Sequence, residues 1–87
     1  MTFRIETAAR GQFTVFFLSG RIDTQARDVL RRLFELQAGF SDIVLDLKDV
    51  RVIHRDVVRF LSSCESDGVQ LENCASYIRE WMAREHD

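Results

Sequence analysis

The chain has 87 residues, of which 46% are hydrophobic and 30% are charged, and its formal net charge is -2. A chain of this length is expected to form one folded domain over residues 1–87. The composition is that of an ordinary globular protein and excludes disorder or a coiled coil for most of the chain. The slightly acidic balance argues against nucleic-acid binding, which needs a clustered basic face. Arg27, Arg31 and Arg32 do cluster, but on one helix they predict a solvated face.

No apolar run approaches the roughly 20 residues needed to cross a bilayer, and residues 1–6 lack the hydrophobic core of a signal peptide. We therefore expect a cytoplasmic protein without membrane insertion. Cys64 and Cys74 are too few for a disulfide framework, and their spacing fits neither a zinc site nor a thioredoxin-like motif. Both are predicted to be small buried side chains, and we expect no metal or other cofactor.

The N-terminal residues predict a β-hairpin. Apolar and polar side chains alternate over residues 3–7, which indicates a strand with one buried face. Residues 13–18 are apolar on both faces, as in an interior strand. Residues 9–12 are predicted to form the turn, and this short connection makes the pair antiparallel.

An amphipathic helix is predicted over residues 24–38. Residues 19–23 break the strand pattern, and Asp23 or Thr24 can cap the helix by accepting a free backbone N–H. Gly39 is predicted to end the helix in a left-handed conformation.

The middle of the chain predicts a buried strand, a charged loop and a second helix. Residues 43–47 are nearly continuously apolar, which is typical of a central parallel strand. After the loop, the hydrophobic period changes from 2 to 3.6, and a helix is expected over residues 56–66. Asp56 is predicted to cap this helix, which ends at Asp67 and Gly68.

The C-terminal part predicts a short strand over residues 69–73 and a last helix capped by Asn73 or Ser76. The order is therefore strand, strand, helix, strand, helix, strand, helix. This predicts an α/β fold with a four-stranded mixed sheet, in which a hairpin is followed by parallel strands with right-handed crossovers.

Three segments resemble the STAS domains, a family that includes anti-sigma factor antagonists and the cytoplasmic tails of sulfate transporters. Residues 18–23, Leu-Ser-Gly-Arg-Ile-Asp, are similar to the family's L-x-G-E-L-D. Residues 43–53, Ile-Val-Leu-Asp-Leu-Lys-Asp-Val-Arg-Val-Ile, are similar to its I-V-L-D-L-S-G-V-x-F-I. Residues 69–73, followed by Tyr77 and Ile78, are similar to its last strand–helix step. The resemblance implies a module that binds a partner protein, such as a histidine-kinase-like anti-sigma factor, and is switched by phosphorylation.

The loop that carries the switch departs from the family pattern. The family has D-S-S-G or D-T-S-G there, with the phosphoacceptor hydroxyl at the start of the second helix. This chain has Arg55 at the phosphoacceptor position and Val57 at the glycine position, so we expect the usual phosphoswitch to be absent. Asp56 is a candidate for a permanent stand-in for phosphate, although it lies one residue past the phosphoacceptor position.

The chain also lacks the final strand and helix that many members of the family have. Such a truncation leaves an unpaired sheet edge, which a partner or a second copy of this chain could cover.

A catalytic interpretation of His54 and Asp56 has little support. The two could act as a base and its orienting group, but neither a nucleophile nor an oxyanion site accompanies them. We therefore expect a protein that is not an enzyme.

The resemblance thus implies a non-enzymatic interaction module in regulatory signalling, similar to a divergent anti-sigma factor antagonist without the usual phosphoacceptor, with partner switching in bacterial transcription regulation as its expected setting. Its partner would be a protein, such as a kinase-like anti-sigma factor, with homodimerisation also open. The docking face is predicted from residues that share one end of the sheet: Asp23, Thr24, His54, Arg55, Asp56, Arg59 and Ser62. The alternative is a small-ligand or lipid-handling accessory subunit of a transporter that binds through the apolar face of the hairpin.

Overall fold

The computed structural model describes residues 2–37 and 39–86, and it shows the predicted α/β architecture. Four strands form one mixed sheet in the order β1-β2-β3-β4, in which β1 and β2 are antiparallel and the other neighbours are parallel. The elements are β1(Phe3–Arg10), β2(Phe13–Ile22), α1(Thr24–Glu35), the short 3-10 helix η1(Phe40–Asp42), β3(Ile43–Ile53), α2(Arg55–Ser66), β4(Gln70–Glu72) and α3(Ser76–His86).

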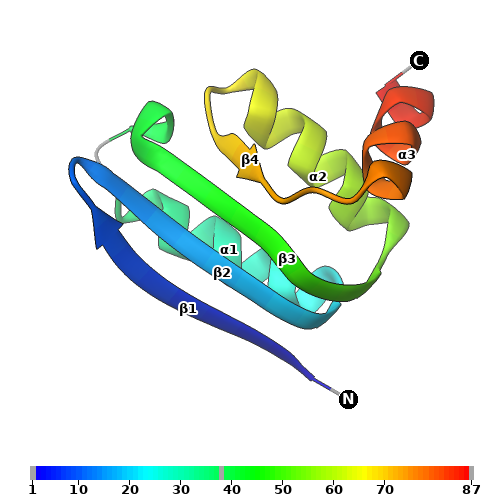
Figure 1. Cartoon of the computed structure of the whole chain (residues 1–87), viewed down its shortest axis with the longest axis horizontal. Helices are drawn as coiled ribbons and strands as arrows, with labels where there is room; N and C mark the ends of the chain where they lie inside the picture. Colours follow the sequence, from blue (N-terminus) through cyan, green and yellow to red (C-terminus); the bar gives the residue numbers. More distant parts are fainter. Residues whose placement is uncertain (1, 38, 87) are drawn as a thin grey trace.

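Two of the helices cover one face of the sheet. Figure 1 shows α1 and α2 behind the strands, with α3 beside β4 at the edge of the sheet. Helix α3 packs against α2. No helix among residues 2–37 and 39–86 is long and apolar enough to span a membrane.

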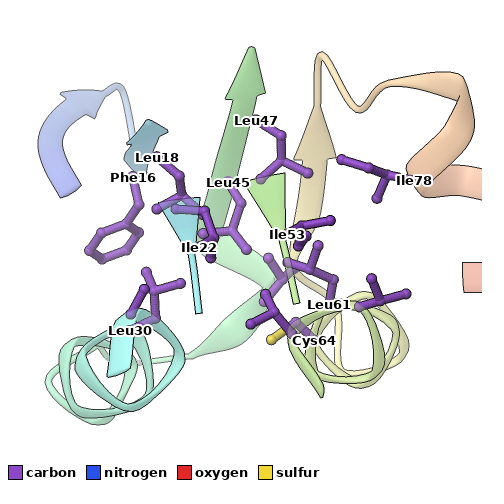
Figure 2. Close-up of a cluster of buried hydrophobic side chains, with 14 of the residues drawn as sticks. Phe16, Leu18, Ile22, Leu30, Leu45, Leu47, Ile53, Leu61, Cys64 and Ile78 are labelled. Atoms are coloured by element: carbon purple, nitrogen blue, oxygen red, sulfur yellow. The ribbon is translucent and has the colours of Figure 1, made fainter. Parts of the chain in front are cut away.

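The core lies between the sheet and these helices, as Figure 2 shows. Inward-facing residues of β2 and β3 meet the apolar stripes of α1 and α2, and Ile78 of α3 joins the same cluster. The stripe of α1 repeats every four residues, since Ala26, Leu30 and Phe34 are its buried positions. Each large side chain that is fully buried contributes about 1.5–3 kcal/mol, so this cluster is the main stabilising feature of the fold.

The hairpin turn is shorter than the sequence predicted. Strands β1 and β2 pair without interruption from Phe3 opposite Gly20 to Arg10 opposite Phe13. Only Gly11 and Gln12 remain in the loop, and Gly11 has a φ of 61°. A glycine suits this position because tight hairpin loops require positive φ values.

Strands β2 and β3 both extend beyond their predicted ends. Residues 48–53, predicted as a charged loop, continue β3 and pair with the last residues of β2. The register of β2 with β3 shifts twice near Gly20, whose φ is 85°. The break in the apolar pattern after residue 18 therefore marks an irregularity within β2 and not its end.

Two of the predicted helix boundaries are wrong. Gly39 has an extended backbone with a φ of -173°, because α1 already ends at Glu35 and its last turn tightens through a bond from the Leu36 N–H to the Leu33 carbonyl. Residue 38, the predicted end, lies outside the described residues. At the start of α3, the Ala75 carbonyl accepts the first helical bond from Arg79, so neither Asn73 nor Ser76 is at the cap position.

Candidate protein-docking surface

The starts of α1 and α2 lie next to each other at one end of the sheet. The His54 N–H donates to the Ile22 carbonyl at 3.0 Å, which joins the residue before α2 to the last residue of β2. The Asp23 carboxylate accepts a hydrogen bond from the Ala26 N–H at 3.0 Å, so Asp23 caps α1 as predicted. The structure thus brings Asp23, Thr24 and His54 together.

His54, and not Asp56, caps α2. The Nδ1 atom of the His54 ring accepts a hydrogen bond from the Asp56 N–H at 3.1 Å. Asp56 lies in the first turn of the helix, where its negative charge interacts favourably with the helix dipole. The prediction that Asp56 is the cap is wrong because the imidazole nitrogen already accepts from the free backbone donor.

Arg55 and Arg59 both bind the carboxylate of Glu85 on α3. Their Nε atoms lie 3.1 and 3.0 Å from the Glu85 oxygens, and the indole N–H of Trp81 donates to the same carboxylate at 3.3 Å. The Arg59 hydrogen bond, followed by those of Arg55 and Trp81, lowers the pKa of Glu85 despite its partial desolvation. The two arginines thus fasten α3 to the exposed side of α2.

Ser62 follows Arg59 by about one turn of α2, on the side of the helix that faces α3. It is half-buried and lines a hollow toward α3 together with Arg59, Ser66 and Glu85. The predicted docking face is therefore divided between the helix starts at the end of the sheet and the junction of α2 with α3.

A groove of about 520 Å³ runs between α1 and α2, and Asp56 and Arg59 form part of its lining. We call it the α1–α2 groove. It is lined by Arg27, Arg31, Phe34, Glu35, Phe40, Asp56, Arg59, Phe60, Ser63, Cys64 and Asp67.

The floor of the α1–α2 groove is aromatic. The rings of Phe34 and Phe60 are stacked with their centroids 6.0 Å apart, and Phe40 meets Phe34 edge-on at 6.1 Å. The guanidinium of Arg31 lies 5.6 Å from the centroid of the Phe60 ring, within the range of a cation–π contact. No carboxylate among residues 2–37 and 39–86 forms an ion pair with Arg31, whereas Arg27 and Arg59 are paired.

Opposite charges lie at the two ends of the α1–α2 groove. Both helices begin at the carboxyl end of the parallel strands, so Arg27 and Arg59 lie toward one end, beside Asp56. Glu35 and Asp67 lie near the ends of the two helices, toward the other end of the groove. The groove therefore combines an apolar floor with a rim that is mainly basic at one end and acidic at the other.

The two cysteines are free, and Cys64 is buried against the groove. Burial, with a smaller contribution from Asp67, raises the pKa of the Cys64 thiol to about 12. Burial also raises the pKa of Cys74. Since the thiolate is the nucleophilic form, neither cysteine is activated for chemistry at neutral pH.

The sequence predictions missed the α1 side of the groove. Arg31 is exposed, as the predicted solvated face requires, but its guanidinium also lies over the Phe60 ring, a contact that the predictions did not include. A signal was present in the spacing of Arg27, Arg31 and Phe34, which places two arginines on the same side of the helix as an aromatic ring.

Comparisons with known proteins do not assign the chain to a family. Neither a scan against protein-family models nor a search of curated proteins found a match.

Proposed function

We propose that this chain is a divergent STAS-like domain that acts as a non-enzymatic protein-interaction module in regulatory signalling, related to the anti-sigma factor antagonists. The α1–α2 groove is the observation that supports the proposal best. An apolar floor with a charged rim is the usual receptor for an amphipathic helix of a partner protein.

The charges of the groove indicate how that helix lies. Its acidic residues would face the end that carries Arg27 and Arg59, and its basic residues would face Glu35 and Asp67. An apolar side chain of the helix would pack on Phe34 and Phe60. Opposite charges at the two ends would favour one orientation of the helix over the reverse.

The proposed module is not switched by phosphorylation of the loop before α2. Arg55 stands at the phosphoacceptor position of the family, and in this structure it is bound to Glu85. Val57 stands at the glycine position and is completely buried. We therefore propose that the surface at the start of α2 remains in a single state.

A photo-crosslinking amino acid at Ser63, an exposed position of the groove, tests the proposal in cells of the source organism. We expect one adduct with a different protein, identified by mass spectrometry. Arg31→Glu in the same chain should abolish the adduct, whereas Arg51→Glu, which reverses an exposed arginine on β3, should leave it unchanged. An adduct that survives Arg31→Glu, or no protein adduct at all, would show that the groove is not the docking site.

The helix-start surface is tested separately by the double variant Arg55→Glu, Asp56→Arg. We expect it to weaken the same adduct, because Asp56 lines the groove. A small apolar molecule that co-purifies with the chain, detected by native mass spectrometry without a protein adduct, would instead support the ligand-handling alternative. The hairpin offers less to such a ligand, since Phe17, at 37%, is its only exposed large apolar side chain among the described residues.

A further inference from the structure

Strand β1 is a regular edge strand with nothing beyond it in the sheet as described for residues 2–37 and 39–86. It pairs with β2 over its full length, Phe3–Arg10, without a bulge. Natural edge strands are commonly blunted by proline, by bulges, by being very short or by charged side chains. Of these devices, β1 has only charged side chains, and because they include both signs they can attract as well as repel a second strand.

The hydrogen bonds to β2 identify which backbone groups of β1 face outward. The Thr2 carbonyl accepts from the Arg21 N–H, so the backbone groups of Thr2 point toward β2. Because the direction alternates along a strand, those of Phe3, Ile5 and Thr7 point away from the sheet. The hairpin agrees with this assignment. The residue that flanks a two-residue loop is hydrogen-bonded to the neighbouring strand, and this residue, Arg10, is an even number of positions from Thr2, so both point their backbone groups toward β2.

The side chains of β1 divide into an apolar and a charged row. Phe3 and Ile5 lie opposite Gly20 and Leu18 on the face that carries the core, and both pack against that core. Arg4 and Glu6 lie on the opposite, open face, with side chains 76% and 63% exposed.

These charges select one register for antiparallel pairing of two β1 strands around a twofold axis. Outward-facing residues must pair with each other, so the axis passes through a residue. An axis at Arg4 or at Glu6 would set that residue against its own copy, and an axis at Thr7 would set Arg4 against Arg10. An axis at Ile5 sets Arg4 against Glu6 twice, which is favourable.

An axis at Ala8 would also oppose charges, with Glu6 facing Arg10. However, the Arg10 guanidinium is already bound to Glu72 on β4 at 2.9 Å. That register would also extend into the turn at Gly11 and would leave Phe3 unpaired. The register at Ile5 is therefore the better of the two.

The apolar side of the edge supports the same location. Phe3 and Val29 of α1 line a common hollow beside β1 together with Gln25, Asp28 and Arg32, and Val29 is 40% exposed. In the Ile5 register, each Phe3 lies next to the Thr7 of the other copy, so the row of Phe3, Ile5 and Thr7 on one β1 strand would meet the same row of the second copy.

We propose that this chain forms a homodimer in which two β1 strands pair antiparallel about Ile5 to give one continuous sheet. The outward backbone groups of Phe3, Ile5 and Thr7 exchange hydrogen bonds with Thr7, Ile5 and Phe3 of the second copy. Arg4 and Glu6 form two symmetrical ion pairs across the junction. The α1–α2 groove is lined by other residues and stays available.

The test uses two variants, each with one charge reversed. Each variant should repel a second copy of itself but pair with the other variant. Sedimentation analysis of the 10.2 kDa chain should show a dimer at sufficient concentration. Arg4→Glu and Glu6→Arg should each raise the dimer dissociation constant about tenfold or more, because like charges then face each other twice. A mixture of the two variants should form a heterodimer in native mass spectrometry, since every cross-strand pair is again Glu with Arg.

The controls separate dimerisation from folding. Both single variants lose the same weak Arg4–Glu6 contact within the chain, so a common folding defect would not be rescued by mixing. Arg10→Glu should leave the dimer intact. A chain that stays monomeric at millimolar concentration would overturn the proposal, as would a mixture that forms no heterodimer or a dimer sensitive to Arg10→Glu but not to Arg4→Glu.

Discussion

The carboxylate of Asp46 accepts two hydrogen bonds from the side-chain amide of Asn73, with both Nδ2–Oδ distances at 3.2 Å. Asp46 lies within β3 and is only 8% exposed, and its carboxylate also accepts the Lys48 N–H at 2.9 Å. Asn73 follows β4 and has a positive φ of 56°. The pair therefore fixes the direction in which the chain leaves β4 on its way to α3.

Substitution of Asn73 should separate the hydrogen bonds from the backbone conformation. We expect Asn73→Gly to lower the free energy of unfolding by about 1.5–3 kcal/mol, because it removes hydrogen bonds to a carboxylate. Asn73→Ala should lose roughly 1 kcal/mol more, because alanine adopts a positive φ less readily than glycine. Urea denaturation of both variants measures the difference in stability. Equal losses of stability would show that the positive φ of residue 73 does not affect the stability of the fold.

Capping of α2 by His54 predicts an unequal response to two alanine substitutions. His54→Ala should cost about 1 kcal/mol through loss of the cap, and His54→Asp should restore most of it. Asp56→Ala should cost about 0.3–1 kcal/mol, since only the interaction of its charge with the helix dipole is lost. Urea midpoints at constant m value compare the three variants. A larger loss of stability from Asp56→Ala than from His54→Ala would show that Asp56 is the residue that caps α2.

The junction of α3 with α2 should weaken in acid through Glu85. Its pKa is lowered, chiefly by the Arg59 hydrogen bond, from an ordinary value of 4.5. The folded state therefore holds fewer protons at this site than the unfolded state. The resulting stabilisation is complete above the ordinary value and is lost as the pH falls through the lower folded-state value. Between about pH 6 and about pH 3, the wild type should lose more stability than Glu85→Gln. Thermal unfolding at each pH, with Glu80→Gln on the same helix as the control, measures this difference.

Two glycines with positive φ should differ in their tolerance of a methyl group. A Cβ at Gly20 would lie 2.7 Å from the Thr2 carbonyl oxygen, whereas a Cβ at Gly11 would meet no atom within 4 Å. We expect Gly11→Ala to cost about 1 kcal/mol and Gly20→Ala about 2–4 kcal/mol, because only the second must also displace β1. Chemical denaturation compares the two, and equal losses would contradict the close approach of β1 to β2 at this point.

The order of the elements could be predicted because the apolar spacing changes clearly between period 2 and period 3.6. The ends of β2 and β3 could not, since the last part of β3 carries exposed charged residues and is held by the backbone pairing of Asp49, Val50, Val52 and Ile53 with β2. Pairing between backbone groups does not depend on the side chains, so it cannot be recognised from the pattern of apolar and polar residues. The sequence placed β2 correctly in the interior of the sheet, because both of its faces are apolar.

The candidate site was predictable only in part. The meeting of Asp23 with His54 follows from the rule that parallel strands end at the same edge of a sheet. The α1–α2 groove depends on the stacking of Phe34 on Phe60, which come from different helices and whose distance is decided by packing in three dimensions. The ion pairs of Glu85 likewise depend on where α3 docks.

The burial of Val57 bears on how a chain of this kind evolves. If its ancestors carried the hydroxyl and glycine of the STAS phosphoswitch, regaining the hydroxyl would remove an exposed arginine, Arg55, and its ion pair with Glu85. Regaining the glycine would remove a fully buried side chain from α2 and would cost about 3 kcal/mol through the cavity and the flexibility of glycine in a helix. That is a large share of the stability of a small domain. The loss of the switch would thus be hard to reverse in evolution, because replacing the valine that now stabilises the fold would destabilise the domain before the earlier regulation returned.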